Sequence, residues 1–295
     1  MQNCINIFRG CLVIALFGLN LIFIPILTIL LGFLAWLIRI KSWQNFVNGL
    51  LQKTPVAWAK VNSWIMEICT HGKWDIQGPS LDPKAWYILI SNHRSWVDIL
   101  VLGYVFAGKA PSFKFFLKKE LLWTLPIAGL ACKAVGFPFM ERHSREDIRK
   151  NPSLKNADIE TTRIACEKFK AYPCTIINFV EGTRFSEEKR ARQESPYQHC
   201  LKPKSGGFAV VLSELHTHLK GILNVTINYS EAKFSFWDFA CGRLKRISVH
   251  YQLLPITQDL IGDYYQNRLY RAHIQNWLNQ LWQAKDHTLE TFTYE

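Results

Sequence analysis

The longest apolar stretch of the chain lies near its amino terminus. No charged residue occurs between Arg9 and Arg39, and an uncharged apolar run of this length is typical of a membrane segment. As one helix it would extend roughly 43 Å at a rise of 1.5 Å per residue, which exceeds a hydrocarbon core of about 30 Å. Asn20 and Pro25 lie near its middle. Two alternatives follow: one tilted helix, or two short helices in a hairpin that enters and leaves the membrane on the same side.

We expect residues 1–41 to be retained as a membrane anchor. The run is too long for a signal peptide, and no cleavage site of small residues follows it. In residues 42–72, Trp, Leu and Ile recur at helical spacing among isolated polar residues. This pattern predicts a pair of amphipathic helices that lie at the membrane interface, or that cover the core of the next domain.

Beyond residue 73, short apolar runs alternate with longer amphipathic stretches. The short runs, rich in aromatic and β-branched residues, predict strands at 85–90, 175–180, 222–227 and 246–254. The longer stretches predict helices at 96–106, 159–171, 207–219 and 264–285. Alternating strands and helices predict an α/β fold over residues 73–295, with a mostly parallel central sheet covered by helices. Ligands of such sheets bind beyond the carboxyl ends of the strands.

Composition narrows the classes of partner. The 295 residues include 35 Lys and Arg against 23 Asp and Glu, so phosphorylated ligands, nucleic acid or an anionic membrane are the candidates. The apolar run favours the membrane and argues against nucleic acid. The eight cysteines contain no CxxC pair, which argues against a zinc site and against a disulfide framework. We therefore expect no metal, and reduced thiols on the cytosolic side.

The first candidate for chemistry is the segment SNHRSWVDIL, residues 91–100. His93 and Asp98 are five positions apart, so in one helix they would lie roughly 140° apart around the axis. They can meet only if His93 lies on the turn between the strand and the helix, with Asp98 in the first helical turn. The carboxylate can then fix one ring nitrogen and leave the other as a base. An ordinary surface contact near a helix start is the alternative.

The second candidate, FVEGTRFS (residues 179–186), also follows a predicted strand. It places a carboxylate, a flexible backbone, a hydroxyl and a guanidinium on one turn: Glu181, Gly182, Thr183 and Arg184. Arginine can bind a phosphate with two hydrogen bonds. A plain charged turn is the alternative, but the ends of parallel strands gather at one edge of a sheet.

Cations next to apolar sequence form a third candidate. They occur in FLKKEL and GFPFMER as Lys118, Lys119 and Arg142. Such residues can hold a charged headgroup beside an aliphatic chain, or they can belong to a solvated basic face.

Together these segments resemble the glycerolipid acyltransferase family, the 1-acylglycerol-3-phosphate acyltransferases of PlsC type. NHRSWVD resembles the first family motif, GFPFMER the second and FVEGTR the third, over about residues 73–255. Val180 stands where the family usually has proline, and Leu223-Asn224-Val225-Thr226 replaces the usual Val-Pro pair of a fourth motif. LKPKSGGF and NVTI are more similar to lysocardiolipin-type and bacterial YihG-like acyltransferases.

The resemblance implies a mechanism. His93, oriented by Asp98, would take the proton from the free hydroxyl of a lysophospholipid, which attacks an acyl thioester. No GxSxG segment occurs, so direct transfer is preferred over an acyl-enzyme. The acceptor phosphate would be held by Lys118, Arg142 and Arg184. Glu181 would order that site or contact the glycerol, while Gly182 and Thr183 would shape the turn. No cofactor is implied beyond acyl-CoA or acyl carrier protein as the acyl donor.

Three other readings stay open. The acceptor could be lysocardiolipin or another lysophospholipid in acyl remodelling; the protein could be a lipid-binding scaffold without activity; or it could be a hydrolase, although nothing marks a nucleophile. The resemblance further implies a bacterial inner-membrane protein with its catalytic domain on the cytoplasmic face.

Overall fold

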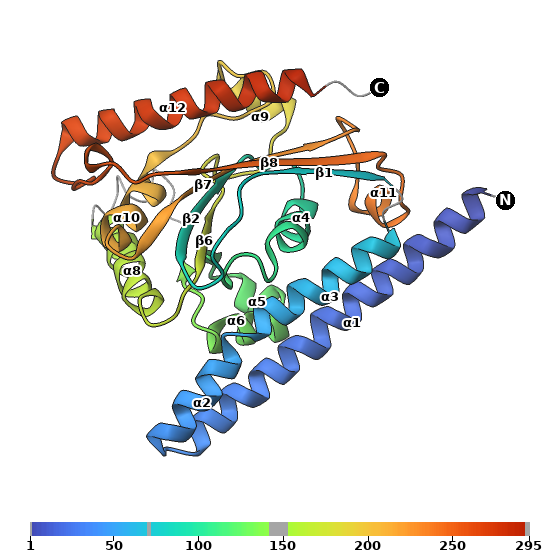
Figure 1. Ribbon diagram of the computed structural model, residues 1–295, viewed down its shortest axis with the longest axis horizontal. Helices are drawn as coiled ribbons and strands as arrows, with labels where there is room; N and C mark the ends of the chain where they lie inside the picture. The colour runs from blue at the N-terminus through green and yellow to red at the C-terminus, as the bar shows by residue number, and fades with distance from the viewer. Residues whose placement is uncertain (1, 70–71, 142–152, 293–295) are drawn as a thin grey trace.

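The structure, a computed structural model, describes residues 2–69, 72–141 and 153–292. Its centre is a six-stranded sheet with the order β1-β8-β7-β2-β6-β3 (Figure 1). The strands are β1 Lys73–Gln77, β2 Trp86–Ser91, β3 Phe113–Phe115, β6 Thr175–Asn178, β7 Leu219–Tyr229 and β8 Arg246–Leu254. Neighbouring strands are parallel except β7 and β8, which are antiparallel. The predicted mostly parallel sheet is confirmed. A separate parallel pair joins β4 Leu117–Lys118 to β5 Phe139–Met140.

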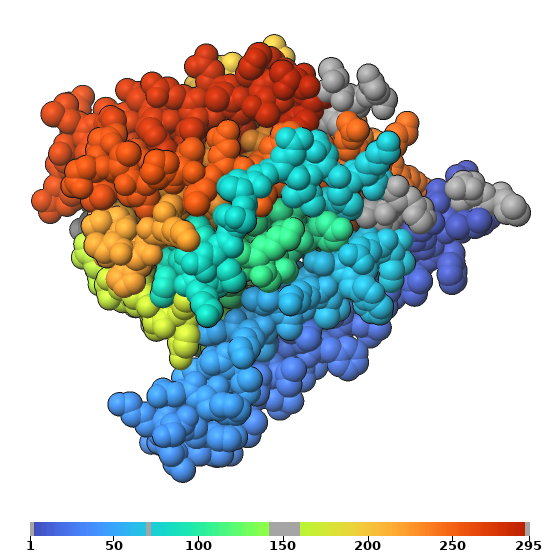
Figure 2. All heavy atoms as spheres, in the orientation of Figure 1, coloured from blue at the N-terminus to red at the C-terminus, as the bar shows by residue number. Residues whose placement is uncertain are grey.

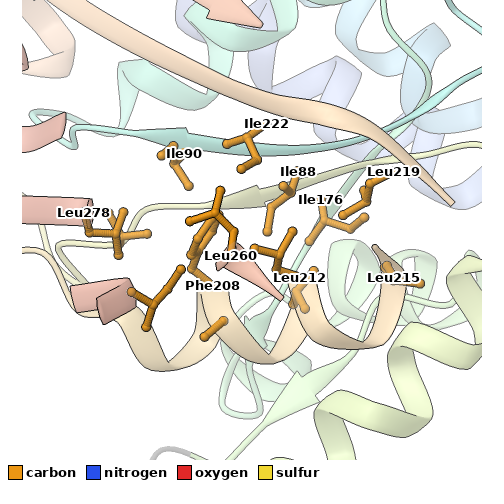
Figure 3. Packing of buried hydrophobic residues seen from close by; sticks show 14 of the residues in the cluster. Ile88, Ile90, Ile176, Phe208, Leu212, Leu215, Leu219, Ile222, Leu260 and Leu278 are labelled. Atoms are coloured by element: carbon orange, nitrogen blue, oxygen red, sulfur yellow. The ribbon is translucent and has the colours of Figure 1, made fainter. Parts of the chain in front are cut away.

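Helices cover both faces of the sheet, because its central strands are apolar on both faces. One face packs against α8 Ser153–Phe169, α10 Ser205–Leu215 and α12 Arg268–Thr291, and the other against α4 Val97–Phe106. Successive residues of β2 divide between them: Ile88 and Ile90 belong to the first core, and Tyr87 and Leu89 to the second. Figure 3 shows the first core, where side chains of α10 lie under the isoleucines of the sheet.

All four strands and all four helices predicted beyond residue 73 form. Their ends are shifted except in the strand at residues 246–254, which has the predicted bounds. The strands β1 and β3 and several short helices were not predicted, because segments of a few residues carry too little periodic signal. The short helices are α5 Leu121–Thr124, α6 Pro126–Ala134, α9 Glu187–Arg192, α11 Phe236–Ala240 and the 3-10 turn Gln258–Leu260.

The amino-terminal apolar run is one helix, α1 Gln2–Leu37, which continues through Asn20 and Pro25. The part from Asn3 to Leu37 is long and apolar enough to cross a membrane, with a mean hydropathy of 2.6. The run therefore does not form the alternative of two short helices within residues 1–41. The predicted helix pair in residues 42–72 forms as α2 Lys41–Leu51 and α3 Thr54–Cys69, which pack against α1 (Figure 1).

Polar side chains join α1 to α3 inside this apolar surface. Nδ2 of Asn20 donates to Oδ1 of Asn62 at 2.7 Å and to the carbonyl oxygen of Trp58 at 3.1 Å. Both asparagines are buried. Asn20 therefore fixes the position of α1 along α3 instead of breaking the helix.

The helix α1 also lies against the α/β domain near both of its ends. Gly10 is so close to α11 that a Cβ there would lie 2.6 Å from Sγ of Cys241. Closer to its carboxyl end, α1 packs against α6. The opposite face is bare and includes the exposed side chains of Phe8, Phe23, Leu30, Phe33, Trp36 and Leu37. Figure 2 shows α1, α2 and α3 together along one side of the molecule.

We expect Asn62→Leu to loosen the contact between α1 and α3. The substitution removes the acceptor of the 2.7 Å hydrogen bond from Asn20, and a buried polar group that loses its partner costs about 1–3 kcal/mol of folding free energy. Thermal unfolding in detergent should show a lower midpoint. Asn45→Leu, on an exposed position of α2, is the control and should leave the midpoint nearly unchanged; equal midpoints for both variants would contradict the role of Asn20.

Candidate active site

The candidate residues meet because three neighbouring strands run in the same direction. Strand β2 pairs in parallel with β6 on one side and with β7 on the other, so their carboxyl ends lie at one edge of the sheet. His93 follows β2, the turn at residues 181–184 follows β6, and Tyr229 is the last residue of β7.

His93 and Asp98 meet as their spacing predicts. Nδ1 of His93 lies 2.7 Å from Oδ2 of Asp98, a fully buried carboxylate in the first turn of α4. The same oxygen accepts the backbone N–H groups of Arg94 at 2.7 Å and Ser95 at 2.9 Å, while Oδ1 accepts the hydroxyl of Tyr229 at 2.5 Å. Because the carboxylate is an acceptor, Nδ1 carries the proton and Nε2 is left as the basic nitrogen.

Several contacts hold the turn that carries His93. The side chain of Asn92 exchanges two hydrogen bonds of 2.9 Å with the backbone of Ile227 in β7. The carbonyl oxygen of His93 accepts the N–H of Phe185 at 2.7 Å, and the imidazole stacks on Phe179 with ring centres 4.0 Å apart. The turn is thus held by β7 and by the segment that follows β6, which fixes the direction of the imidazole.

A cavity of about 570 Å³ opens beside His93. Its polar end contains His93, Lys118, Gly182, Thr183 and Arg184. The rest is mainly apolar, and its wall comes both from the α/β domain and from the amino-terminal helices, including Phe113, Phe115, Phe137, Ile177, Leu21, Ile24 and Trp58. The cavity therefore joins a base and cations to a passage along α1.

The cations at the polar end have no carboxylate partner among the described residues. The guanidinium of Arg184 lies over the ring of Trp96, 4.6 Å from its centre. Lys118 is exposed at the end of β4. Both face the cavity, so an anionic group could bind there. Arg142 lies outside the described residues.

The turn at residues 181–184 has a backbone shape that brings it close to neighbouring side chains. Gly182 has a φ of 72°, which favours glycine, and a Cβ there would lie 3.4 Å from Nζ of Lys204. Nζ of Lys189 donates to Oγ1 of Thr183 at 3.0 Å and to the carbonyl oxygen of Arg184 at 2.8 Å. Sequence reasoning missed Lys189, although it follows the motif by one helical turn.

Glu181 points away from the cavity. It is fully buried, and its Oε1 accepts the indole N–H of Trp282 in α12 at 3.2 Å. Lys285, one turn later, donates to the carbonyl oxygen of Val225 and to Oγ1 of Thr226. Burial raises the pKa of Glu181 to about 8 and lowers the pKa of Lys285 to about 7. Both roles expected for Glu181, ordering of the site and a contact with glycerol, stay predictions.

The same overall architecture occurs in the crystal structure of the 1-acyl-sn-glycerophosphate acyltransferase PlsC from Thermotoga maritima. The two structures superpose with a TM-score of 0.57 over 100% of both chains, at 13% sequence identity. At this identity the likeness concerns the fold.

Sequence relatives fall into one functional class by name. An uncharacterized acyltransferase of Saccharomyces cerevisiae is 26% identical over 236 residues, which are 70% of this chain and 58% of the relative. The 1-acyl-sn-glycerol-3-phosphate acyltransferase 3 of Arabidopsis thaliana is 30% identical over 52% of this chain and 41% of its own. Lysophosphatidylinositol acyltransferase 10 of Caenorhabditis elegans is 25% identical over 95% of this chain and 71% of its own.

The matched part thus spans only about half the length of the first two relatives. The family model described as acyltransferase matches residues 68–230, more than half of the chain and the segment that contains His93, Asp98 and the turn at residues 181–184. The chain belongs to the acyltransferase family.

Proposed function

We propose that the protein transfers a fatty acyl group from an acyl thioester to the free hydroxyl of a lysophospholipid, with 1-acylglycerol-3-phosphate as acceptor and phosphatidic acid as product. The observation that carries the proposal is one cavity that joins His93, the charges of Arg184 and Lys118, which have no carboxylate partner among the described residues, and an apolar passage. A lysophospholipid needs all three: a base for its hydroxyl, cations for its phosphate and apolar space for a chain.

The chemistry follows from the hydrogen bonds of His93. Nε2 accepts the proton of the acceptor hydroxyl while that oxygen attacks the thioester carbonyl carbon. The C–S bond then breaks, and the imidazolium returns the proton to the departing sulfur. Asp98 holds Nδ1 and stabilises the positive charge of the ring between these steps.

A remodelling reaction is the second candidate, with lysophosphatidylinositol or lysocardiolipin as acceptor. The observation in its favour is that the nematode relative named for lysophosphatidylinositol matches 95% of this chain. Those acceptors carry phosphodiesters, whereas 1-acylglycerol-3-phosphate carries a phosphate monoester with more charge to offer Arg184 and Lys118. A panel of lysolipids, each supplied with acyl-CoA or acyl carrier protein as donor, separates the reactions by mass spectrometry of the products.

The bare face of α1 supports attachment to a membrane. Because α1 packs against the α/β domain near both ends, a helix standing across the bilayer would bring the domain surface into the hydrocarbon. We therefore propose that α1 does not cross the bilayer but lies in one leaflet of a bacterial inner membrane. The domain would then stay on the cytoplasmic face, where its free thiols remain reduced.

We expect His93→Ala to lower acyl transfer by roughly 10²- to 10⁴-fold, the usual loss when a general base is removed, with little change in melting temperature. The matched control is His250→Ala, because His250 also pairs with an aspartate, Asp75, at 3.2 Å but lies outside the cavity. Radiolabelled acyl transfer with each purified variant gives the rates. Near-normal turnover by folded His93→Ala protein would overturn the mechanism.

A second prediction concerns Arg184→Lys, which keeps the charge but loses the planar fork. With loss of one charged hydrogen bond, kcat/KM for a phosphorylated acceptor should fall roughly 10- to 100-fold. Background hydrolysis of the thioester by water needs no acceptor phosphate and should change little. Arg190→Lys, whose guanidinium pairs with Glu187, serves as the control.

A structural role for Arg184 gives a different result. If its guanidinium only stabilises the turn, then transfer, hydrolysis and melting temperature should fall together. That outcome would remove Arg184 from the acceptor site.

The membrane topology can be tested with a single thiol on α12. In a chain whose Cys4, Cys11, Cys69 and Cys132 are replaced by serine, so that the four remaining natural cysteines are buried, Asn276→Cys introduces a cysteine at an exposed position. An impermeant maleimide should label it in inside-out vesicles and not in intact spheroplasts. Labelling only in spheroplasts would place the domain on the opposite face and contradict the proposal.

A further inference from the structure

Strand β7 contributes a side chain to the candidate active site that no sequence motif marked. Tyr229, at the end of this strand, is 2% exposed, and its ring packs against Phe234 with ring centres 4.6 Å apart. Its hydroxyl donates to Oδ1 of Asp98 at 2.5 Å. The tyrosine is therefore one hydrogen bond from the carboxylate and two from the imidazole of His93.

The hydroxyl acts as a donor in this position. Burial, and next the charge of Asp98, raise the pKa of Tyr229 well above its ordinary value, so the phenol keeps its proton. Oδ2 of Asp98 is occupied by His93 and the two backbone N–H groups. Within the described chain, Tyr229 provides the hydrogen bond that Oδ1 receives.

The register of β7 places this hydroxyl. Two residues before Tyr229, the backbone of Ile227 exchanges hydrogen bonds with Asn92. Residues two apart in a strand face the same side, and both Ile227 and Tyr229 pack in the core beneath α4. One strand thus holds the segment from Asn92 to Asp98 at both ends.

We propose that Tyr229 is a positioning residue for acyl transfer, whose hydroxyl fixes the Asp98 carboxylate so that Oδ2 faces Nδ1 of His93. This inference rests on the proposed function of His93 as the base. The terminal torsion of an aspartate is soft, so four donors on two oxygens restrict it more than three donors on one. A fixed carboxylate fixes the tautomer and the direction of the imidazole, and small errors in such placement are costly in rate.

The tyrosine also draws charge from the carboxylate. The other ionisable groups near Tyr229 and Asp98 are His93 and Arg94 on the turn after β2, and Glu181 on the turn after β6. Without the hydroxyl, more negative charge on Asp98 would face His93, and the protonated imidazole would be favoured. A stronger donor at position 229 would have the opposite effect.

The test is Tyr229→Phe, which removes only the hydroxyl. We expect kcat to fall roughly 10-fold, less than the loss on removal of a general base, because the imidazole itself is kept. The acid limb of the kcat/KM profile should move to higher pH, with the acceptor KM nearly unchanged. The matched control is Tyr251→Phe, because Tyr251 lies in the same core and donates to the carbonyl oxygen of Pro79 at 2.9 Å. It should lower the melting temperature without moving the pH profile.

A second variant covers the case in which Tyr229→Phe does not fold. Site-specific replacement of Tyr229 by 3-fluorotyrosine keeps the hydroxyl and makes it a stronger donor, so the acid limb should move to lower pH. Shifts of opposite sign in the two variants would not arise from a packing role. An unchanged profile in the folded variants, or losses matched by Tyr251→Phe, would overturn the role of Tyr229.

His93→Ala, assayed alongside, separates this inference from the proposal on which it rests. If His93→Ala retains acyl transfer, the proposed function fails together with the role of Tyr229. If His93→Ala is inactive and both Tyr229 variants behave as the unmodified protein, then only the role of Tyr229 fails.

Discussion

The parallel pairing of β2 with β6 and β7 is the constraint on which the site depends. In a parallel sheet, neighbouring strands end at the same edge, and here three consecutive strands in space bring residues near positions 93, 181 and 229 within reach of one another. The position of β2 is secured by buried side chains on both of its faces, Ile88 and Ile90 on one and Tyr87 and Leu89 on the other. Any change that shifted its register would separate His93 from the side chains that orient it.

Behind the cavity lie three buried ionisable side chains. Asp98, Glu181 and Lys285 are almost fully buried, and each has a hydrogen-bond partner: His93 for Asp98, Trp282 for Glu181 and the carbonyl oxygen of Val225 for Lys285. In front, the cavity wall is completed by α1, which contributes Leu21 and Ile24. The site therefore has buried polar groups behind it and an apolar wall that α1 shares with the α/β domain, an arrangement suited to a substrate with a charged head and an aliphatic chain.

Much of the fold could be predicted from local patterns. Buried strands and amphipathic helices can be recognised from the spacing of their apolar residues. The strand at residues 246–254 was therefore predicted with the bounds that the structure shows. Short elements such as β3 were not predicted, because three residues are too few to show a periodic pattern of apolar positions. The continuity of α1 was left undecided, since Asn20 and Pro25 suggest a break unless the hydrogen bond to Asn62 is known.

The sequence by itself determined that His93 and Asp98 could pair, because their spacing fits only a turn followed by a helix, and that Arg184 follows a strand. It could not determine what surrounds them. Tyr229 and Trp282 lie 131 and 101 positions from Asp98 and Glu181, the carboxylates that they contact. Only strand order and the packing of α12 brought them together. The physical reason is that local spacing fixes side-chain direction within one element, whereas burial of the sheet's two faces decides which distant elements become neighbours.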